Sequence, residues 1–158
     1  GEYFAAAVGE VNVTTKMREV GALIGGEGNG GVIYPALHYG RDAMVGVALF
    51  LTNLAYKKMK VSELRATYPE YVIAKNKIEL SDSALIDKIL TEVKEVFAAE
   101  DINTIDGVKI SFEAKKERVH LRRSNTEPII RIYAEAATAE AADALAQQII
   151  AIANKIIG

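Results

Sequence analysis

The sequence contains no cysteine and no tryptophan, and only three of its 158 residues are proline. Without cysteine the chain can form neither a disulfide framework nor a thiolate metal site, which fits a reducing compartment such as the cytoplasm. The longest apolar run, residues 45–51, is broken by a glycine and is too short to cross a bilayer, so no membrane partner is expected. The net charge is −2, and this lack of a basic excess argues against a nucleic-acid partner.

What is present is an ordinary globular composition, with half of the residues hydrophobic and a quarter charged. The length leaves room for one domain or two small ones. A polar, proline-containing stretch breaks the hydrophobic periodicity at residues 62–70, so we predict two domains, residues 1–62 and residues 63–158. Because residues 3–8 already resemble the interior of a strand, we also expect the chain to be a piece of a longer protein.

The pattern in the first domain predicts strands at residues 3–8, 22–25 and 32–34, with a short helix between the first two. Asp42 is a suitable N-cap for the helix that follows. Apolar residues cover more than one face of that helix, so we expect it to be well buried.

The pattern in the second domain predicts two helices, the first capped from residues 81–83 and the last from Thr138. Strands are expected at residues 71–80, 108–112, 119–121 and 129–135. The resulting order, β-α-β-β-β-α, predicts an α+β domain in which an antiparallel sheet is backed by two helices.

The segment GGEGNGG, residues 25–31, contains five glycines around Glu27 and Asn29. Its glycines do not match the spacing of nucleotide-binding loops, and a carboxylate has the wrong charge to cradle phosphate. A carboxylate and a carboxamide on nearly bare backbone suit neutral sugar hydroxyl groups. The alternative from the residues alone is a flexible turn between strands.

The segment RRSNTEP, residues 122–128, joins two predicted strands. Ser124, Asn125 and Thr126 offer two hydroxyls and an amide, and backbone N–H groups in a tight turn can form a concave anion site. Arg122 or Arg123 adds the planar fork that binds phosphate bidentately. This pattern predicts a phosphate-binding loop, with a surface turn as the alternative.

Together the two segments resemble the α-D-phosphohexomutases, which include phosphoglucomutase, phosphomannomutase and phosphoglucosamine mutase. Members have four domains, with a G-E-x-S/N-G-G/H sugar loop in the third and an R-x-S-N-T-x-P phosphate loop in the fourth. These motifs correspond to GEGNGG (residues 26–31) and RRSNTEP here, and the similarity covers nearly the whole chain. The resemblance implies an α/β remnant of the third domain, followed by the α+β fourth domain at the C-terminus.

The resemblance also implies roles for particular residues. Glu27 and Asn29 would hold the sugar hydroxyls, and the non-transferred phosphate would be held by Arg122, Ser124, Asn125 and Thr126. In the family, a phosphoserine in the first domain donates its phosphoryl group, Mg²⁺ binds in the second, and a hexose 1,6-bisphosphate forms as the intermediate. No T-x-S-H-N or D-G-D-x-D-R motif occurs here, so we expect no catalytic or metal-binding residue in this chain. We therefore expect the chain to be inactive without the missing N-terminal domains.

Two points stay open at this level. Some members carry a histidine at the position of Glu10, which leaves the sugar preference among glucose, mannose and glucosamine phosphates undecided. The alternatives to a phosphoglucomutase or phosphomannomutase are a phosphoglucosamine mutase and a non-catalytic module that binds sugar phosphates or nucleic acid. His38 and His120 are about eighty residues apart and have no carboxylates at metal-ligand spacing, so no metal site is expected from them.

Overall fold

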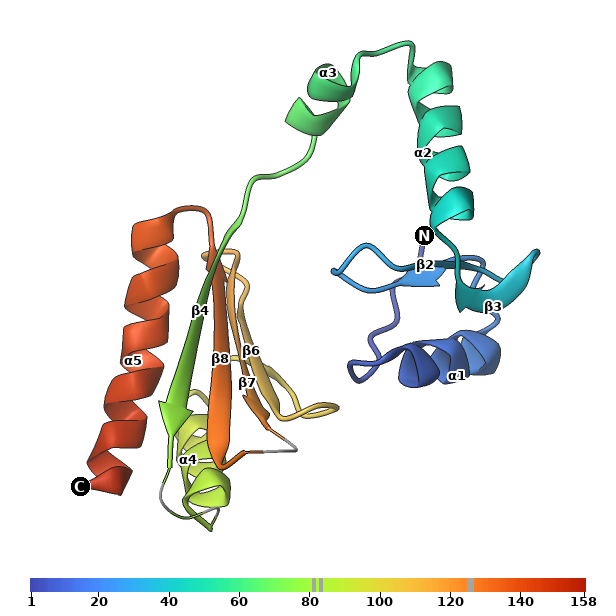
Figure 1. The fold of residues 1–158 in the computed structure, drawn as a ribbon. Coiled ribbons are helices and arrows are strands. Elements are labelled where there is room, and N and C mark those ends of the chain that lie inside the picture. Colours follow the sequence, from blue (N-terminus) through green and yellow to red (C-terminus); the bar gives the residue numbers. More distant parts are fainter. Residues whose placement is uncertain (81, 83, 125–126) are drawn as a thin grey trace. The chain divides into compact units, whose positions relative to one another are not determined.

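The computed structural model describes residues 1–80, 82, 84–124 and 127–158 (Figure 1). The chain forms two compact units, Gly1–Pro69 and Glu70–Gly158, and each is considered by itself. The division lies in the polar stretch at which the hydrophobic periodicity breaks. The domain boundary predicted from the sequence, between residues 62 and 63, falls within helix α3.

Unit 1, residues 1–69, consists of a small antiparallel sheet with three helices. Its elements are α1 (Glu10–Val20), β1 (Gly25–Gly26), β2 (Val32–Tyr34), β3 (His38–Arg41), α2 (Ala43–Lys57) and α3 (Val61–Ala66). The strands pair in the order β1-β2-β3. Met17 of α1 and Ile33 of β2 are almost fully buried, and the Arg18 guanidinium lies 3.7 Å from the centre of the Tyr39 ring. These contacts fix α1 against the sheet that carries the glycine-rich loop.

Two of the strands predicted for unit 1 differ from the structure. Residues 3–8 form no strand, and Tyr3 is 85% exposed. The strand expected at residues 22–25 is limited to Gly25 and Gly26. A strand is stabilised by the neighbour that satisfies its backbone groups, and β1 to β3 pair only with one another, so the apolar pattern of residues 3–8 finds no partner among the described residues.

Helix α2 begins where predicted but is not buried. Asp42 is its N-cap, and the carboxylate accepts a hydrogen bond from the Val45 backbone N–H at 3.0 Å. The expectation of burial is wrong, because no residue of α2 is buried, and Met44 and Leu51 are more than half exposed. An apolar helix needs a second layer to cover it, and within unit 1 the main contacts of α2 are with β2 and α3.

Unit 2, residues 70–158, confirms the predicted α+β architecture. Its elements are β4 (Val72–Glu79), α4 (Ala84–Val96), β5 (Asp101–Asn103), β6 (Val108–Phe112), β7 (Glu117–Arg123), β8 (Ile129–Ala136) and α5 (Ala139–Ile157). All neighbouring strands are antiparallel, in the order β4-β8-β7-β6-β5. The sequence analysis missed β5, a three-residue edge strand without a clear alternating pattern.

The core of unit 2 lies between one face of the sheet and the two helices. Alternate residues of β6, β7 and β8 point into it, and so do the apolar stripes of α4 and α5, including Ile110, Val119, Leu121, Ile132, Ile89, Val93, Leu145 and Ile149. Figure 1 shows α5 running along β4 and β8. The intervening residues of β7, which include His120 and Arg122, therefore lie on the opposite face of the sheet.

The predicted helix caps in unit 2 are found where the structure describes them. Thr138 caps α5 by accepting a hydrogen bond from the Ala141 N–H at 3.2 Å. Asp82 accepts one from the Ala84 N–H at 2.8 Å, at the start of α4, whereas Ser81 and Ser83 lie outside the described residues. None of the helices in the described part of the chain is long and apolar enough to cross a membrane.

Candidate functional site

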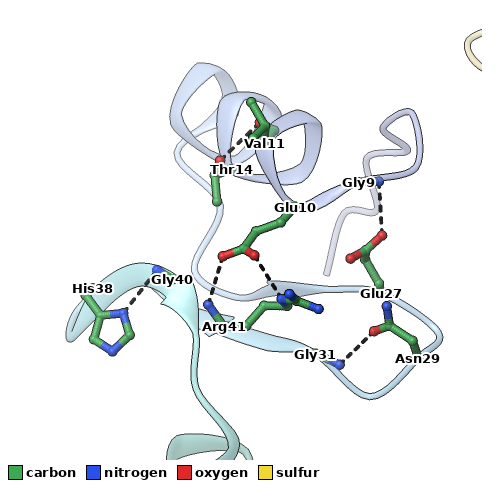
Figure 2. Close-up of polar contacts among 10 residues, drawn as sticks. All are labelled: Gly9, Glu10, Val11, Thr14, Glu27, Asn29, Gly31, His38, Gly40 and Arg41. Carbon is green, nitrogen blue, oxygen red and sulfur yellow. Dashed lines mark hydrogen bonds and ion pairs between the residues drawn. The ribbon is translucent and has the colours of Figure 1, made fainter.

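The glycine-rich loop connects β1 and β2 as a tight, closed turn (Figure 2). The Glu27 N–H donates to the Gly31 carbonyl at 3.1 Å, and the Gly30 N–H donates to the Glu27 carbonyl at 3.1 Å. Gly30 has a φ of 94°, which an L-residue adopts only with strain. The loop is therefore an ordered hairpin that presents the side chains at positions 27 and 29.

The carboxylate of Glu27 is directed to the first turn of α1. Its Oε1 accepts a hydrogen bond from the Gly9 backbone N–H at 3.0 Å (Figure 2). Gly9 is the N-cap of α1, and Glu27 accepts the hydrogen bond of its backbone N–H from a distant part of the sequence. Glu27 is half-buried, and this hydrogen bond holds its carboxylate in one orientation. The second carboxylate oxygen can accept a hydrogen bond from a ligand.

Asn29 is oriented by its own loop. Its Oδ1 accepts a hydrogen bond from the Gly31 N–H at 3.0 Å (Figure 2). This hydrogen bond to the loop backbone is the contact expected for a simple turn. It uses only the amide oxygen of Asn29, so the amide nitrogen can still donate to a ligand. Glu27 and Asn29 also share the lining of a cavity of about 610 Å³, together with residues of α1 such as Lys16.

Glu10, the residue that departs from the family pattern, is paired within unit 1. Its Oε2 lies 2.9 Å from Nε of Arg41, and its Oε1 accepts a hydrogen bond from the Arg41 backbone N–H at 3.2 Å (Figure 2). Both carboxylate oxygens are thus engaged by one residue of β3.

The predicted phosphate loop joins β7 and β8 at one end of the five-stranded sheet. Ser124, at its start, is buried, and its N–H donates to the Ile129 carbonyl at 3.0 Å, which closes the loop. Asn125 and Thr126 lie outside the described residues. The structure therefore brings Arg122 and Ser124 to the same strand end, and the other two residues stay predictions.

The guanidinium of Arg122 is oriented by Asp106, a residue that the sequence analysis did not identify as part of the site. Arg122 Nε lies 2.8 Å from Asp106 Oδ2, an ion pair whose angle is not that of a hydrogen bond. Because Nε faces Asp106, the terminal amino groups are the part of the fork that can grip an anion. Asp106 precedes Gly107, whose φ of 78° makes the turn into β6.

The strand register places a second arginine beside Arg122. Arg131 of β8 is the direct partner of Arg122, and Lys77 of β4 is the partner of Arg131. All three lie on the sheet face opposite the helices. Like charges directly opposite each other are destabilising unless a counter-charge intervenes, so this cationic row favours an anionic ligand. The sequence analysis did not identify Arg131 as a site residue, because the pairing of β7 with β8 is what places it beside Arg122. The alternation of β8 was the one sequence signal for the face on which it lies.

Two residues of the cationic row form ion pairs with carboxylates, and the charge of Glu127 also acts on Lys77. Asp106 pairs with Arg122, and Glu79 lies 2.7 Å from Nζ of Lys77. That contact lowers the pKa of Glu79 and raises the pKa of Lys77 through their mutual hydrogen bond, so both groups are charged at neutral pH. The Lys77 pair is exposed and therefore weak, which leaves the lysine able to exchange its partner for an anion.

His120 lies on the same sheet face as Arg122 and is neutral at neutral pH. Burial lowers the pKa of its imidazole below the ordinary value of 6.5, an effect to which the charges of Arg122 and Lys109 add. The imidazole Nε2 contacts the Asp106 backbone carbonyl. A carbonyl can only accept, so Nε2 carries the proton and donates the hydrogen bond.

We expect unit 2 to lose stability as the pH falls through 6.5, because the unfolded chain then binds a proton that folded His120 excludes. The loss should level off once the pH is below the lowered, folded-state pKa. An NMR titration of the imidazole should give a pKa below 6.5, and His120→Gln should reduce the pH dependence of the urea midpoint between about pH 8 and about pH 5. A measured pKa at or above 6.5 would contradict the expectation.

The described residues contain no group of three or more His, Asp or Glu side chains that could hold a metal ion. His38 takes part in a local contact instead, with its Nε2 3.1 Å from Asp42 Oδ2. The pKa of Asp42 is lowered, first by the hydrogen bond from the Val45 N–H and then by the one from His38.

Comparison with known families matches both units. The family model described as phosphoglucomutase/phosphomannomutase, alpha/beta/alpha domain III, matches residues 1–71, and that of the C-terminal domain matches residues 73–152. The fold, the two loops and these matches define the class: the chain belongs to the phosphoglucomutase/phosphomannomutase family.

Individual relatives agree with this assignment. A phosphoglucosamine/phosphogalactosamine mutase from Sulfurisphaera tokodaii is 37% identical over 90% of this chain and 31% of its own length. A phosphoglucomutase/phosphomannomutase from Thermococcus kodakarensis is 39% identical over 85% of this chain and 29% of its own length. The crystal structure of a family protein from Burkholderia thailandensis covers 94% of this chain and 31% of its own, with 27% identity and a TM-score of 0.75. The chain thus spans about a third of the length of the relatives it matches.

Proposed function

We propose that this chain is the substrate-binding part of a phosphohexomutase that interconverts hexose 1-phosphate and hexose 6-phosphate. The observation that carries the proposal is the cationic row that ends at the RRSNTEP loop, where the strand register places Arg131 directly between Arg122 and Lys77. Asp106 and Glu79 already pair with Arg122 and Lys77, and a phosphate dianion adds negative charge beside Arg131. The guanidinium groups of Arg122 and Arg131 supply the donors for its oxygens.

In this proposal the two units have separate tasks. Glu27 and Asn29 of unit 1 bind hydroxyl groups of the sugar, while Arg122, Ser124, Asn125 and Thr126 of unit 2 bind the phosphate that is not transferred. A phosphoserine elsewhere in the full-length protein transfers its phosphoryl group to the substrate, and the hexose 1,6-bisphosphate then returns its other phosphoryl group to the serine. A binding site that recognises only the phosphate group accepts either phosphorylated end of the bisphosphate. The same site therefore positions the intermediate for both transfers.

We place the phosphoserine and the Mg²⁺ ligands in parts of the full-length protein beyond this chain, and the enzyme in the cytoplasm. Two observations support further parts of the protein beyond this chain. The relatives are about three times as long, and the exposed apolar residues of α2 need other residues to cover them. The absence of cysteine supports the cytoplasmic location.

Phosphoglucosamine mutase is the second candidate, because relatives from Sulfurisphaera tokodaii and Methanopyrus kandleri carry that activity in their names, the second as probable. These activities differ in the substituent at C2 of the sugar. Comparing kcat/KM for the 1-phosphates of glucose, mannose and glucosamine separates them.

The full-length enzyme tests the proposal. We expect it to isomerise at least one of these hexose phosphates, and Glu27→Ala to lower kcat/KM about tenfold or more, because a charge-assisted hydrogen bond to the sugar is lost. Glu63→Ala is the matched control, since that carboxylate is exposed on α3 and lies outside the cavity lining. Absence of turnover with all three sugars, or salt-dependent binding of RNA or DNA, would overturn the proposal in favour of a binding module.

A further inference from the structure

Glu10 and Arg41 join two segments of unit 1 that are far apart in sequence. Both oxygens of the Glu10 carboxylate contact Arg41, one at the side-chain Nε and one at the backbone N–H. The glutamate is the first residue of α1 and the arginine is the last residue of β3, so the contact ties the start of the helix to the sheet edge.

The side chain of Arg41 also lies directly over the glycine-rich loop. A methyl group added at Gly31 would come within 2.6 Å of Arg41 Cδ, so the arginine occupies the space that a larger residue would take. Gly31 is the residue that closes the loop, because its carbonyl accepts from Glu27 N–H and its N–H donates to Asn29 Oδ1. Arg41 therefore packs on the residue to which both proposed sugar ligands are bonded.

The contacts form a closed ring, and Figure 2 shows its Glu10–Arg41 and Gly9–Glu27 hydrogen bonds. It runs from Glu10 to Arg41, from there over Gly31 to Glu27, and back through the hydrogen bond from Gly9 N–H to Glu27 Oε1. Gly9 and Glu10 are neighbours in the chain, so a displacement of the Arg41 contact also displaces the donor that holds Glu27.

This ring acts on orientation more than on stability. Arg41 is about half exposed and Glu10 about a third, and ion pairs at such exposure contribute little to the free energy of folding. A carboxylate that binds a sugar hydroxyl, in contrast, must be held within a fraction of an ångström, because misplacement of a binding group lowers the rate steeply.

We propose that Glu10 and Arg41 are a positioning pair for Glu27: they act on the substrate through this carboxylate and do not contact the sugar themselves. The inference rests on the proposed function of Glu27. It assigns Glu10 a task different from that of a sugar ligand, since both of its oxygens are engaged by Arg41.

A double-mutant cycle in the full-length enzyme tests the pair. We expect Arg41→Gln to lower kcat/KM about fivefold to tenfold, with the melting temperature nearly unchanged. In the Glu27→Ala background the same substitution should cause no further loss, because the carboxylate that it positions is gone. Glu10→Gln keeps the size of the side chain and should give a smaller loss with the same non-additivity, which provides a second test should Arg41→Gln fail to fold.

The outcomes separate the possible failures. Additive losses from Arg41→Gln and Glu27→Ala would mean that Arg41 contacts substrate itself, and unchanged kinetics for Arg41→Gln and Glu10→Gln would mean that the pair positions nothing. Either result overturns the inference. If Glu27→Ala alone is without effect, the proposed function of the loop fails instead. Thr15→Val removes an exposed hydrogen bond of the same helix, from Thr15 Oγ1 to the Val11 carbonyl, at a residue outside the cavity lining, and should leave kcat/KM unchanged.

Discussion

Replacing Arg122 with alanine in the full-length enzyme should lower kcat/KM by about ten- to 150-fold, the equivalent of about 1.5–3 kcal/mol for a hydrogen bond to a charged group. The loss should appear in both directions of the reaction, because the proposed grip holds the phosphate at either end of the bisphosphate. Arg122→Lys keeps the charge but removes the planar fork, so we expect an intermediate loss.

The chain offers a matched control one residue away. Arg123 is paired in register with Ile130, whose side chain belongs to the core, so Arg123 leaves the sheet toward the side opposite Arg122. We expect Arg123→Ala to change kcat/KM less than about twofold, because screening leaves an exposed charge that makes no contact with the phosphate little effect. Equal losses for both variants would indicate a general effect of positive charge, and no loss for Arg122→Ala would contradict the phosphate assignment.

Gly107→Ala should destabilise unit 2 by about 2–4 kcal/mol, the largest effect on stability that we expect from a single methyl group in this chain. Gly107 has a φ of 78°, and a Cβ there would lie 2.1 Å from the Leu121 carbonyl oxygen. That oxygen belongs to the backbone of β7, so the steric clash can be relieved only if the strand that carries Arg122 shifts. Chemical denaturation of the variant should show a lower midpoint with a similar m-value.

The C-terminal glycine provides the control for this prediction. Gly158 also has a positive φ, 99°, but nothing lies within 4 Å of a Cβ added there. Gly158→Ala should therefore change the free energy of unfolding by less than about 0.5 kcal/mol. If the two substitutions have equal effects, the steric contact with Leu121 is not the cause, and the close approach of the turn to β7 is relieved without cost.

Apart from β5, the secondary structure of unit 2 followed from its sequence because its strands are half-buried and its helices are amphipathic. Residues such as Ile110 and Val119 alternate with polar neighbours, and the stripes of α4 and α5 recur at helical spacing. Local capping chemistry at Thr138 fixed the start of α5 in the same way. Unit 1 was less predictable, since residues 3–8 and helix α2 carry apolar patterns whose meaning depends on which layers cover them.

The sequence by itself determined the α+β class of unit 2, the two loops and the residue types that they present, because motif spacing and periodicity are local properties of the chain. The tertiary structure decided which distant groups act on those loops: Asp106 and Arg131 on Arg122, and the Glu10–Arg41 pair beside Glu27. These contacts depend on strand register and on turns that join residues far apart in sequence. Such pairings are set by the packing of the whole unit, so no local pattern encodes them.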